Sequence, residues 1–284
     1  PEGKWQYYTM AGKTNAEEIY EEGKRNEEWY RIDEIGDTYY QYWDMDSLIS
    51  EYADLHYPNG QLIEKISYKK GLKDGKFTGY YENGQKKHIR TYKDDKLDGK
   101  FADYTESGQI LRKQGYVNDL LDGPSKEWYL NGEVKVKAAY KQGKLDGGFM
   151  SYDSLGRKVT KGEYEMGLKA GDWLTWYPSG KKKERSSYFS GKANGPYTLW
   201  DEIGRIIKEG EYSDDLKHGV WITFDPDLDR QESYEYYDMG IAKLKYFYKY
   251  YDNGNVMEEP AFTEYYRDGE WRQLFDNERI QYLT

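Results

Sequence analysis

The sequence predicts an all-β protein: an elongated, single antiparallel sheet of about twelve β-hairpin repeats, forming a solenoid-like twisted ribbon. Two glycine series and one tyrosine series recur every 24 residues in a common register, over seven consecutive repeats. Helical periodicity is absent from nearly the whole chain. The three series are Gly75, Gly99, Gly123, Gly147, Gly171, Gly195 and Gly219; Gly60, Gly84, Gly108, Gly132, Gly156, Gly180 and Gly204; and Tyr68, Tyr92, Tyr116, Tyr140, Tyr164, Tyr188 and Tyr212.

A single repeat, residues 84–108, shows how each hairpin is expected to form. Residues 85–92 are the first strand, 93–99 a turn, 101–105 the second strand and 106–108 a tight turn to the next repeat. Asp-Gly and Asn-Gly pairs supply the positive φ angles that such turns need. Residues 15–25 are the one stretch that could form a short helix, although they keep the hairpin register.

The register extends to both ends and predicts one continuous repeat domain over residues 1–284. We expect degenerate units over about 1–60, regular units over about 61–226, a register slip at about 226–244 and final units over about 245–284. Because the sequence starts within a repeat, we also expect further chain before Pro1.

One repeat carries a family resemblance. The segment Tyr68-Lys-Lys-Gly71-Leu-Lys-Asp-Gly75-Lys-Phe77-Thr-Gly-Tyr80-Tyr81-Glu-Asn-Gly84 resembles the MORN repeat, most closely its bacterial variant. The resemblance covers essentially the whole chain and implies hairpins stacked side by side in one sheet. Chains similar to this variant are often described as antitoxin components, and others resemble exported or envelope proteins of bacteria.

Two aromatic stripes follow the repeats. They lie three residues apart on the same strand, an odd spacing that places them on opposite faces of a sheet. One stripe contains Phe77, Phe101, Phe149, Trp173, Tyr197 and Trp221. The other is our candidate partner-binding row: Tyr80, Tyr104, Trp128, Tyr152, Trp176, Trp200 and Phe224. We expect most of these rings to pack against the next hairpin, and the largest of the second row to anchor a partner.

The sequence offers little for catalysis, so we expect no enzyme, no cofactor and no resident metal. The chain has 3 His and no Cys, which leaves no thiol or Cys-zinc chemistry. His56, His88 and His218 fall in distant repeats. The segment Asp225–Asp229 resembles the start of a calcium loop, but Arg230 and Tyr236 occupy the positions that require Gly and Glu. We interpret it as an irregular loop, with calcium binding as the alternative.

Charge is unevenly distributed along the chain, which carries a net charge of −10. Residues 1–56 hold 5 basic and 14 acidic side chains, residues 57–224 hold 30 and 24, and residues 225–284 hold 7 and 14. Nucleic-acid binders usually have a clearly basic domain, so this pattern disfavours a nucleic-acid partner. The strongest local basic spots are 86–87 and 181–185. Without a long apolar run, we expect no direct membrane insertion.

These observations favour a non-enzymatic repeat scaffold that binds another protein along an aromatic face of the sheet. We expect an accessory subunit of a bacterial envelope or secretion-related complex, in the periplasm, at the cell surface or secreted, with the cytoplasm as the alternative. A carbohydrate-binding module of the envelope, with a glycan as partner, is the first competing hypothesis. The second is an antitoxin that neutralises a toxin partner.

Overall fold

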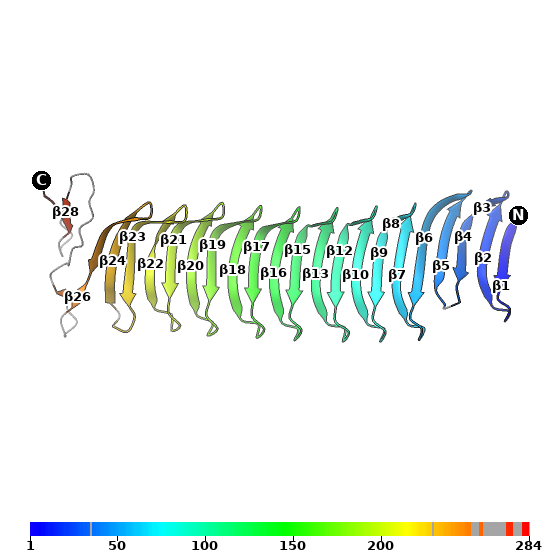
Figure 1. The fold of residues 1–284 in the computed structure, drawn as a ribbon, viewed down its shortest axis with the longest axis horizontal. Coiled ribbons are helices and arrows are strands. Elements are labelled where there is room, and N and C mark those ends of the chain that lie inside the picture. The colour runs from blue at the N-terminus through cyan, green and yellow to red at the C-terminus, as the bar shows by residue number, and fades with distance from the viewer. Residues whose placement is uncertain (35, 229, 251–255, 258–270, 275–279, 284) are drawn as a thin grey trace. The chain divides into compact units, whose positions relative to one another are not determined.

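The computed structural model describes residues 1–34, 36–228, 230–250, 256–257, 271–274 and 280–283. Within these ranges 25 strands belong to one antiparallel sheet (Figure 1). The all-β hairpin prediction is therefore confirmed. The segment with helical potential is strand β2 (Thr14–Glu21). The final units expected over about 245–284 lie largely outside the described residues.

The chain divides into two compact units, residues 1–146 with 154–156 and residues 147–153 with 157–284. The strands of the first unit are β1 (Gly3–Tyr8), β2, β3 (Lys24–Arg25), β4 (Glu27–Ile32), β5 (Thr38–Asp44), β6 (Ser47–His56), β7 (Leu62–Lys69), β8 (Leu72–Lys73), β9 (Gly75–Tyr80), β10 (Lys86–Lys93), β11 (Lys96–Leu97), β12 (Gly99–Tyr104), β13 (Ile110–Val117), β14 (Leu120–Leu121), β15 (Gly123–Trp128) and β16 (Val134–Lys141). Strand β17 (Lys144–Tyr152) has residues in both units.

The strands of the second unit are β18 (Lys158–Glu165), β19 (Leu168–Trp176), β20 (Lys182–Phe189), β21 (Lys192–Trp200), β22 (Ile206–Ser213), β23 (Leu216–Asp225), β24 (Arg230–Asp238), β25 (Ile241–Phe247), β26 (Lys249–Tyr250), β27 (Val256–Met257), β28 (Trp271–Leu274) and β29 (Ile280–Leu283). The last four form two separate two-stranded sheets, β26 with β27 and β28 with β29.

In the repeat that follows Gly84, the second strand of the hairpin is interrupted near the Asp-Gly pair. There the Asp98 amide donates to the Thr91 carbonyl across the hairpin at 2.8 Å, and Gly99 has a φ of 120°. The sequence predicted the whole of 93–99 as a turn, and this was wrong for the Asp-Gly pair. The pair instead forms an irregularity between β11 and β12. Gly99 adopts a positive φ there, which is unfavourable for residues that have a Cβ atom.

The hairpin turn itself is Asp94–Asp95, with φ angles of 49° and 66°. Two-residue hairpin turns need positive φ at both positions, which Asp tolerates. Asp95 also joins its hairpin to the preceding one: its amide donates to the Lys73 carbonyl at 3.0 Å, and its Oδ1 accepts from the Lys73 amide at 2.7 Å. We call this pair of bonds the aspartate clamp. It recurs between Asp46 and Arg25, Asp119 and Leu97, and Asp215 and Ala193.

The opposite ends of the strands are joined by tight turns of the predicted Asn-Gly kind. Gly84 has a φ of 82°, and its amide donates to the Tyr81 carbonyl at 2.8 Å. Side chains of this turn reach the next hairpin, because Tyr81 Oη donates to the Tyr104 carbonyl and Asn83 Nδ2 to the Glu106 carbonyl, each at 2.8 Å. Consecutive hairpins are thus linked at both ends of their strands.

Strand alternation divides the side chains between two faces of the sheet. The packed face bears Phe77 and its equivalents at the 24-residue spacing, and the open face bears Tyr80 and its equivalents. Arg90 pairs with Phe77 and therefore lies on the packed face. Ile89 pairs with both Thr78 and Ala102, so these three residues lie on the open face. The two faces thus continue from β9 through β10 to β12.

Most of the core of each unit lies on the packed face, although the small side chain of Ala102 is also buried on the open face. In the first unit Phe77 is 4 % exposed and contacts Tyr92 edge-on at 4.8 Å between ring centroids. In the second, Trp221 is 1 % exposed and contacts Tyr212 edge-on at 4.9 Å. Edge-to-face pairs of this kind add about 0.5–1.5 kcal/mol beyond area burial. The tyrosine series therefore packs against the first aromatic stripe.

Two strand glycines make room for the tryptophans of the second unit. A Cβ on Gly162 would lie 2.3 Å from the Trp173 ring, and one on Gly210 would lie 2.3 Å from the Trp221 ring. Neither glycine belongs to the turn series or has a positive φ. Their role is therefore spatial, because each leaves the volume that an indole fills on the neighbouring strand.

Candidate binding surface

The three histidines are not brought together by the fold. His56 lies on β6, where its amide donates to Asp37 Oδ1 at 2.5 Å. His88 on β10 has Nε2 at 3.0 Å from Glu64 Oε1, and His218 lies on β23 in the other unit. Across the described residues, no group of three or more His, Asp or Glu side chains is placed to hold a metal ion. In the same ranges, no helix has the length and apolar character needed to cross a bilayer.

The segment proposed as an irregular loop, Asp225–Asp229, lies between β23 and β24. The Asp225 carboxylate accepts from the amides of Asp227 and Leu228 at 3.0 and 3.2 Å, so one of its oxygens caps the loop itself. Asp229 is outside the described residues. Strand pairing changes here, because Gly219 faces Tyr237, 18 positions on, whereas Gly195 faces Tyr212, 17 positions on.

The seven residues of the candidate partner-binding row lie on the open face, at or near the ends of second strands. The first unit holds Tyr80, Tyr104 and Trp128, and the second holds Tyr152, Trp176, Trp200 and Phe224. Each of the seven is half-buried. Of the packed-face stripe, Phe77, Phe101, Trp173 and Trp221 are buried and Phe149 and Tyr197 are half-buried, so the open-face row is the one in which every ring keeps some exposed surface.

Lysine side chains lie over three tryptophans of this row. Lys126 Nζ is 4.7 Å from the Trp128 ring centroid, Lys158 Nζ is 5.8 Å from Trp176, and Lys182 Nζ is 5.7 Å from Trp200. Such cation–π contacts hold the ammonium near the ring at about 0.5–1 kcal/mol when exposed. The row thus presents aromatic surface and positive charge side by side.

Charge is distributed differently on the two faces of the first unit. Strand alternation places a run of lysines on the open face between β9 and β16, among them Lys76, Lys100, Lys113, Lys126 and Lys137. Arg90 and Arg112 lie on the packed face, where both bind Asp103, at 2.6 Å for Arg90 and 2.5 Å for Arg112. The Arg90 guanidinium also stacks 3.7 Å from the Phe101 centroid.

The open face of the second unit carries charges of both signs. It bears Lys158, Lys161, Lys182 and Arg185 together with the acids Glu163, Asp172, Glu209 and Glu211. Arg185 pairs with Asp172 at 2.6 Å. Hydrogen bonds from Ser187 and then Arg185 lower the pKa of Asp172, which keeps this carboxylate charged. Sequence reasoning missed this contrast because it counted charge along the chain; combining the repeat register with strand alternation would have found it.

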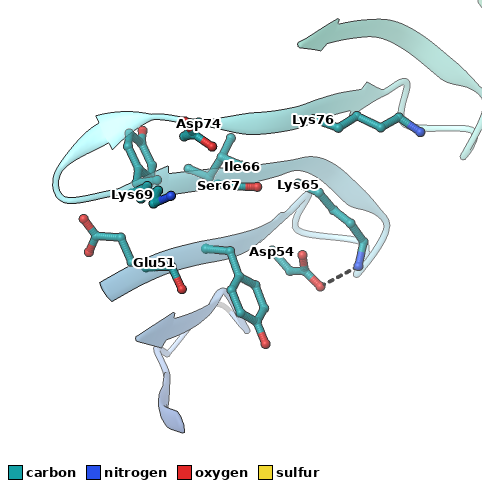
Figure 2. Close-up of a pocket in the computed structure, with 11 residues that line it drawn as sticks. Glu51, Asp54, Lys65, Ile66, Ser67, Lys69, Asp74 and Lys76 are labelled. Atoms are coloured by element: carbon teal, nitrogen blue, oxygen red, sulfur yellow. Dashed lines mark hydrogen bonds and ion pairs between the residues drawn. The ribbon is translucent and has the colours of Figure 1, made fainter. Parts of the chain in front are cut away.

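A shallow pocket of about 410 Å³ opens among β6, β7 and β9 (Figure 2). Asp54 and Lys65 form an ion pair at 3.0 Å there, and this hydrogen bond raises the pKa of Lys65. Burial, followed by the nearby Glu28 carboxylate, raises the pKa of Tyr52 to about 12. The pocket therefore holds a neutral phenol beside a satisfied ion pair, a lining that suits polar contacts more than proton transfer.

Comparison with known families matches four segments to the MORN repeat variant: residues 55–70, 73–94, 121–142 and 169–189. Residues 55–189 therefore carry MORN repeat variant repeats, as the sequence predicted. No curated protein matches the chain.

The solved structures that match the chain include the following three. "Crystal Structure of TcdB2-TccC3-TEV" is 12 % identical over 88 % of this chain, with a TM-score of 0.23. "Crystal Structure of TcdB2-TccC3-Cdc42" is 9 % identical over 98 %, also with a TM-score of 0.23. The "Photorhabdus luminescens Tc holotoxin pore" with a TccC3 mutation is 12 % identical over 88 %, with a TM-score of 0.22. This chain spans 15–16 % of their length.

Proposed function

We propose that this MORN-variant repeat protein is a non-catalytic scaffold that binds another protein through the aromatic row of its open face. The observation that carries the proposal is the difference between the two aromatic stripes. Four of the six packed-face rings are buried in the core, whereas all seven rings of the open-face row, including Trp128, Trp176 and Trp200, are half-buried. Rigid aromatic anchors on a preformed sheet are the features that concentrate binding energy at protein interfaces.

The partner class follows from the shape of the surface. A row of rings recurring at each hairpin offers a broad contact area, as a protein–protein interface needs. The pocket beside Asp54 and Lys65 is too open and too polar to enclose an apolar small molecule. We place the protein as an accessory subunit of a larger bacterial assembly, with the envelope as the compartment to examine first.

A variant pair tests the role of the row. The triple variant Trp128→Ala, Trp176→Ala, Trp200→Ala removes the three indoles, and we expect it to lose the partner captured by the tagged chain. The matched control is Leu130→Ala, Leu155→Ala, Ile203→Ala, which removes three apolar side chains that are 76, 70 and 65 % exposed in neighbouring turns. Circular dichroism checks that both variants keep the sheet.

The experiment is a pull-down with the tagged chain from envelope and cytosolic fractions of the host, read by mass spectrometry. The proposal requires a stoichiometric protein that the control variant retains and the indole variant loses. Retention of every captured protein by the indole variant would overturn it.

A glycan is the second candidate partner, because the tryptophans recur at a fixed spacing and exposed rings stack on sugars. Glycan binding predicts several equivalent sites, so each single Trp→Ala change should remove only a share of the binding. Cosedimentation with insoluble cell-wall glycan measures this directly. Loss of all binding from one substitution would favour a single protein-shaped patch instead.

A further inference from the structure

Three lysines face one another on consecutive strands of the first unit. The strand register pairs Lys113 of β13 with Lys126 of β15, and Lys126 with Lys137 of β16. Directly opposed residues on one face have Cβ atoms about 4.5–5.5 Å apart, and like charges at that distance are destabilising. The fold therefore keeps a row of positive charge that opposes its own stability.

Acidic side chains do not neutralise Lys113 and Lys126, the first two members of this row. Among the described residues, Lys76, Lys100, Lys113 and Lys126 form no ion pair. The carboxylates of this stretch lie elsewhere. Asp103 and Glu127 point to the packed face, and the others cluster at the hairpin ends: Glu82, Asp94, Asp95, Asp98, Glu106, Asp119, Asp122 and Glu133.

The second unit shows that the repeat does not require this arrangement. At the positions equivalent to Lys113 and Lys137 it has Lys161 and Arg185, but acids stand beside them, and Arg185 is paired with Asp172. The same backbone thus accommodates a neutralised open face. Lys113 and Lys126 of the first unit form no ion pair, and they therefore suit a ligand that carries negative charge.

We propose that the open face of residues 76–137 docks a carboxylate-rich segment of the partner protein, with Lys113 and Lys126 at the centre and Tyr104 and Trp128 beside them. This inference rests on the proposed scaffold function and assigns the chemistry of its partner. Carboxylates that reach the lysine row replace the like-charge repulsion by attraction, while the rings supply apolar contact.

A protein fits this surface better than a nucleic acid. The lysine row is narrow and acidic hairpin ends border it on both sides, so a polyphosphate backbone, with one charge about every 1.7 Å of duplex, meets repulsion at the rims. The arginines Arg90 and Arg112, which suit phosphate best, are engaged with Asp103 on the other face. A protein can place separate carboxylates beside the lysines without placing negative charge next to the acidic hairpin ends.

Fluorescence anisotropy with a labelled dodecaglutamate peptide tests the assignment on the full chain. Reversing two charges in K113E/K126E should weaken binding about tenfold, since each exposed ion pair contributes about 0.2–1 kcal/mol and reversal replaces attraction with repulsion. The matched control K13E/K24E makes the same change of net charge at two exposed positions of the same unit that lie outside residues 76–137, and should stay within about twofold. The neutral variant K113Q/K126Q should fall between them.

Dodecathymidylate and phosphatidylglycerol vesicles serve as competing probes. Tighter binding of either than of the peptide would overturn the proposal, as would equal weakening by K13E/K24E and K113E/K126E. The captured partner separates the two proposals. If it is lost from the indole variant but kept by K113E/K126E, the acidic-partner inference falls and the scaffold function stands; if both variants keep it, both fall.

Discussion

The packed faces of the two units fill equivalent positions in different ways. In the first unit, polar side chains occupy the centre: Gln114 Nε2 donates to Ser125 Oγ at 3.1 Å, and both residues are buried. In the second unit, large rings lie over glycines, as with Trp221 over Gly210. In both pairs the two positions fill the space together, with Gln114 larger than Ser125 and Trp221 larger than Gly210, so either position can carry the larger side chain.

The largest effect should follow from emptying one such pair. We expect Trp221→Ala to lower the free energy of unfolding by about 3–5 kcal/mol, because a fully buried ring leaves a cavity over Gly210 that the backbone cannot fill. Urea unfolding followed by circular dichroism measures it. Trp200→Ala, on the open face, is the control and should cost less than half as much; equal losses would contradict the assignment of the core to the packed face.

Overfilling a pair should be the next largest effect. In Gly210→Ala the new Cβ would lie 2.3 Å from the Trp221 ring, so we expect a loss of about 1–3 kcal/mol in the free energy of unfolding. Gly148→Ala in the same unit is matched, since nothing lies within 4 Å of its added Cβ. That control should stay within about 0.5 kcal/mol of the parent. A similar loss in both variants would show that strand glycines matter for backbone freedom and not for ring volume.

Converting a pair of the first unit to the packing of the second tests directly whether the two positions share one volume. Ser125→Phe alone should destabilise by about 1–3 kcal/mol, because Gln114 already fills the space and loses its hydrogen bond. Adding Gln114→Gly should recover most of that loss, and a double-mutant cycle measures the coupling. Additive losses would mean that the two positions do not share one volume.

The smallest effect at neutral pH concerns Tyr197, whose pKa burial and the Glu184 carboxylate raise to about 12. An unfolded tyrosine titrates near 10, so the folded state binds this proton more tightly. Its contribution to stability is complete below about pH 10 and is lost as the pH rises from 10 to 12. We expect Tyr197→Phe to leave stability at pH 7 nearly unchanged and to reduce its decline over that range. An identical alkaline decline in Tyr197→Phe would contradict this.

The fold could be predicted from the sequence because the 24-residue spacing of Gly75, Gly84 and Tyr68 equivalents sets strand, turn and register together. Alternation then assigned the two aromatic stripes to opposite faces. The turn was predicted too long, as 93–99 and not Asp94–Asp95 alone, because Asp-Gly is a strong turn signal and the sequence did not show that Gly99 lies at a strand irregularity.

The candidate surface was only partly accessible to sequence reasoning. The aromatic row follows from the repeat, and its role in binding stays a prediction. The pairing of Gly162 with Trp173 depends on a contact between neighbouring strands, which a series of identical residues does not display. The lysine row was missed because a count of charged residues along the chain includes the acidic residues of the turns, which offset the lysines. The row becomes visible only when strand pairing assigns the lysines to one face.

The aspartate clamp gives the chain a direction of assembly. Asp95, Asp119 and Asp215 each bond to a residue 22 positions earlier, so the groups that receive a hairpin loop have always been synthesised before the loop itself. At about 5–20 residues per second, the ribosome delivers each new repeat within a few seconds of the one that receives it. A nascent chain can therefore close its sheet one hairpin at a time, with the last completed hairpin serving as the template for the next.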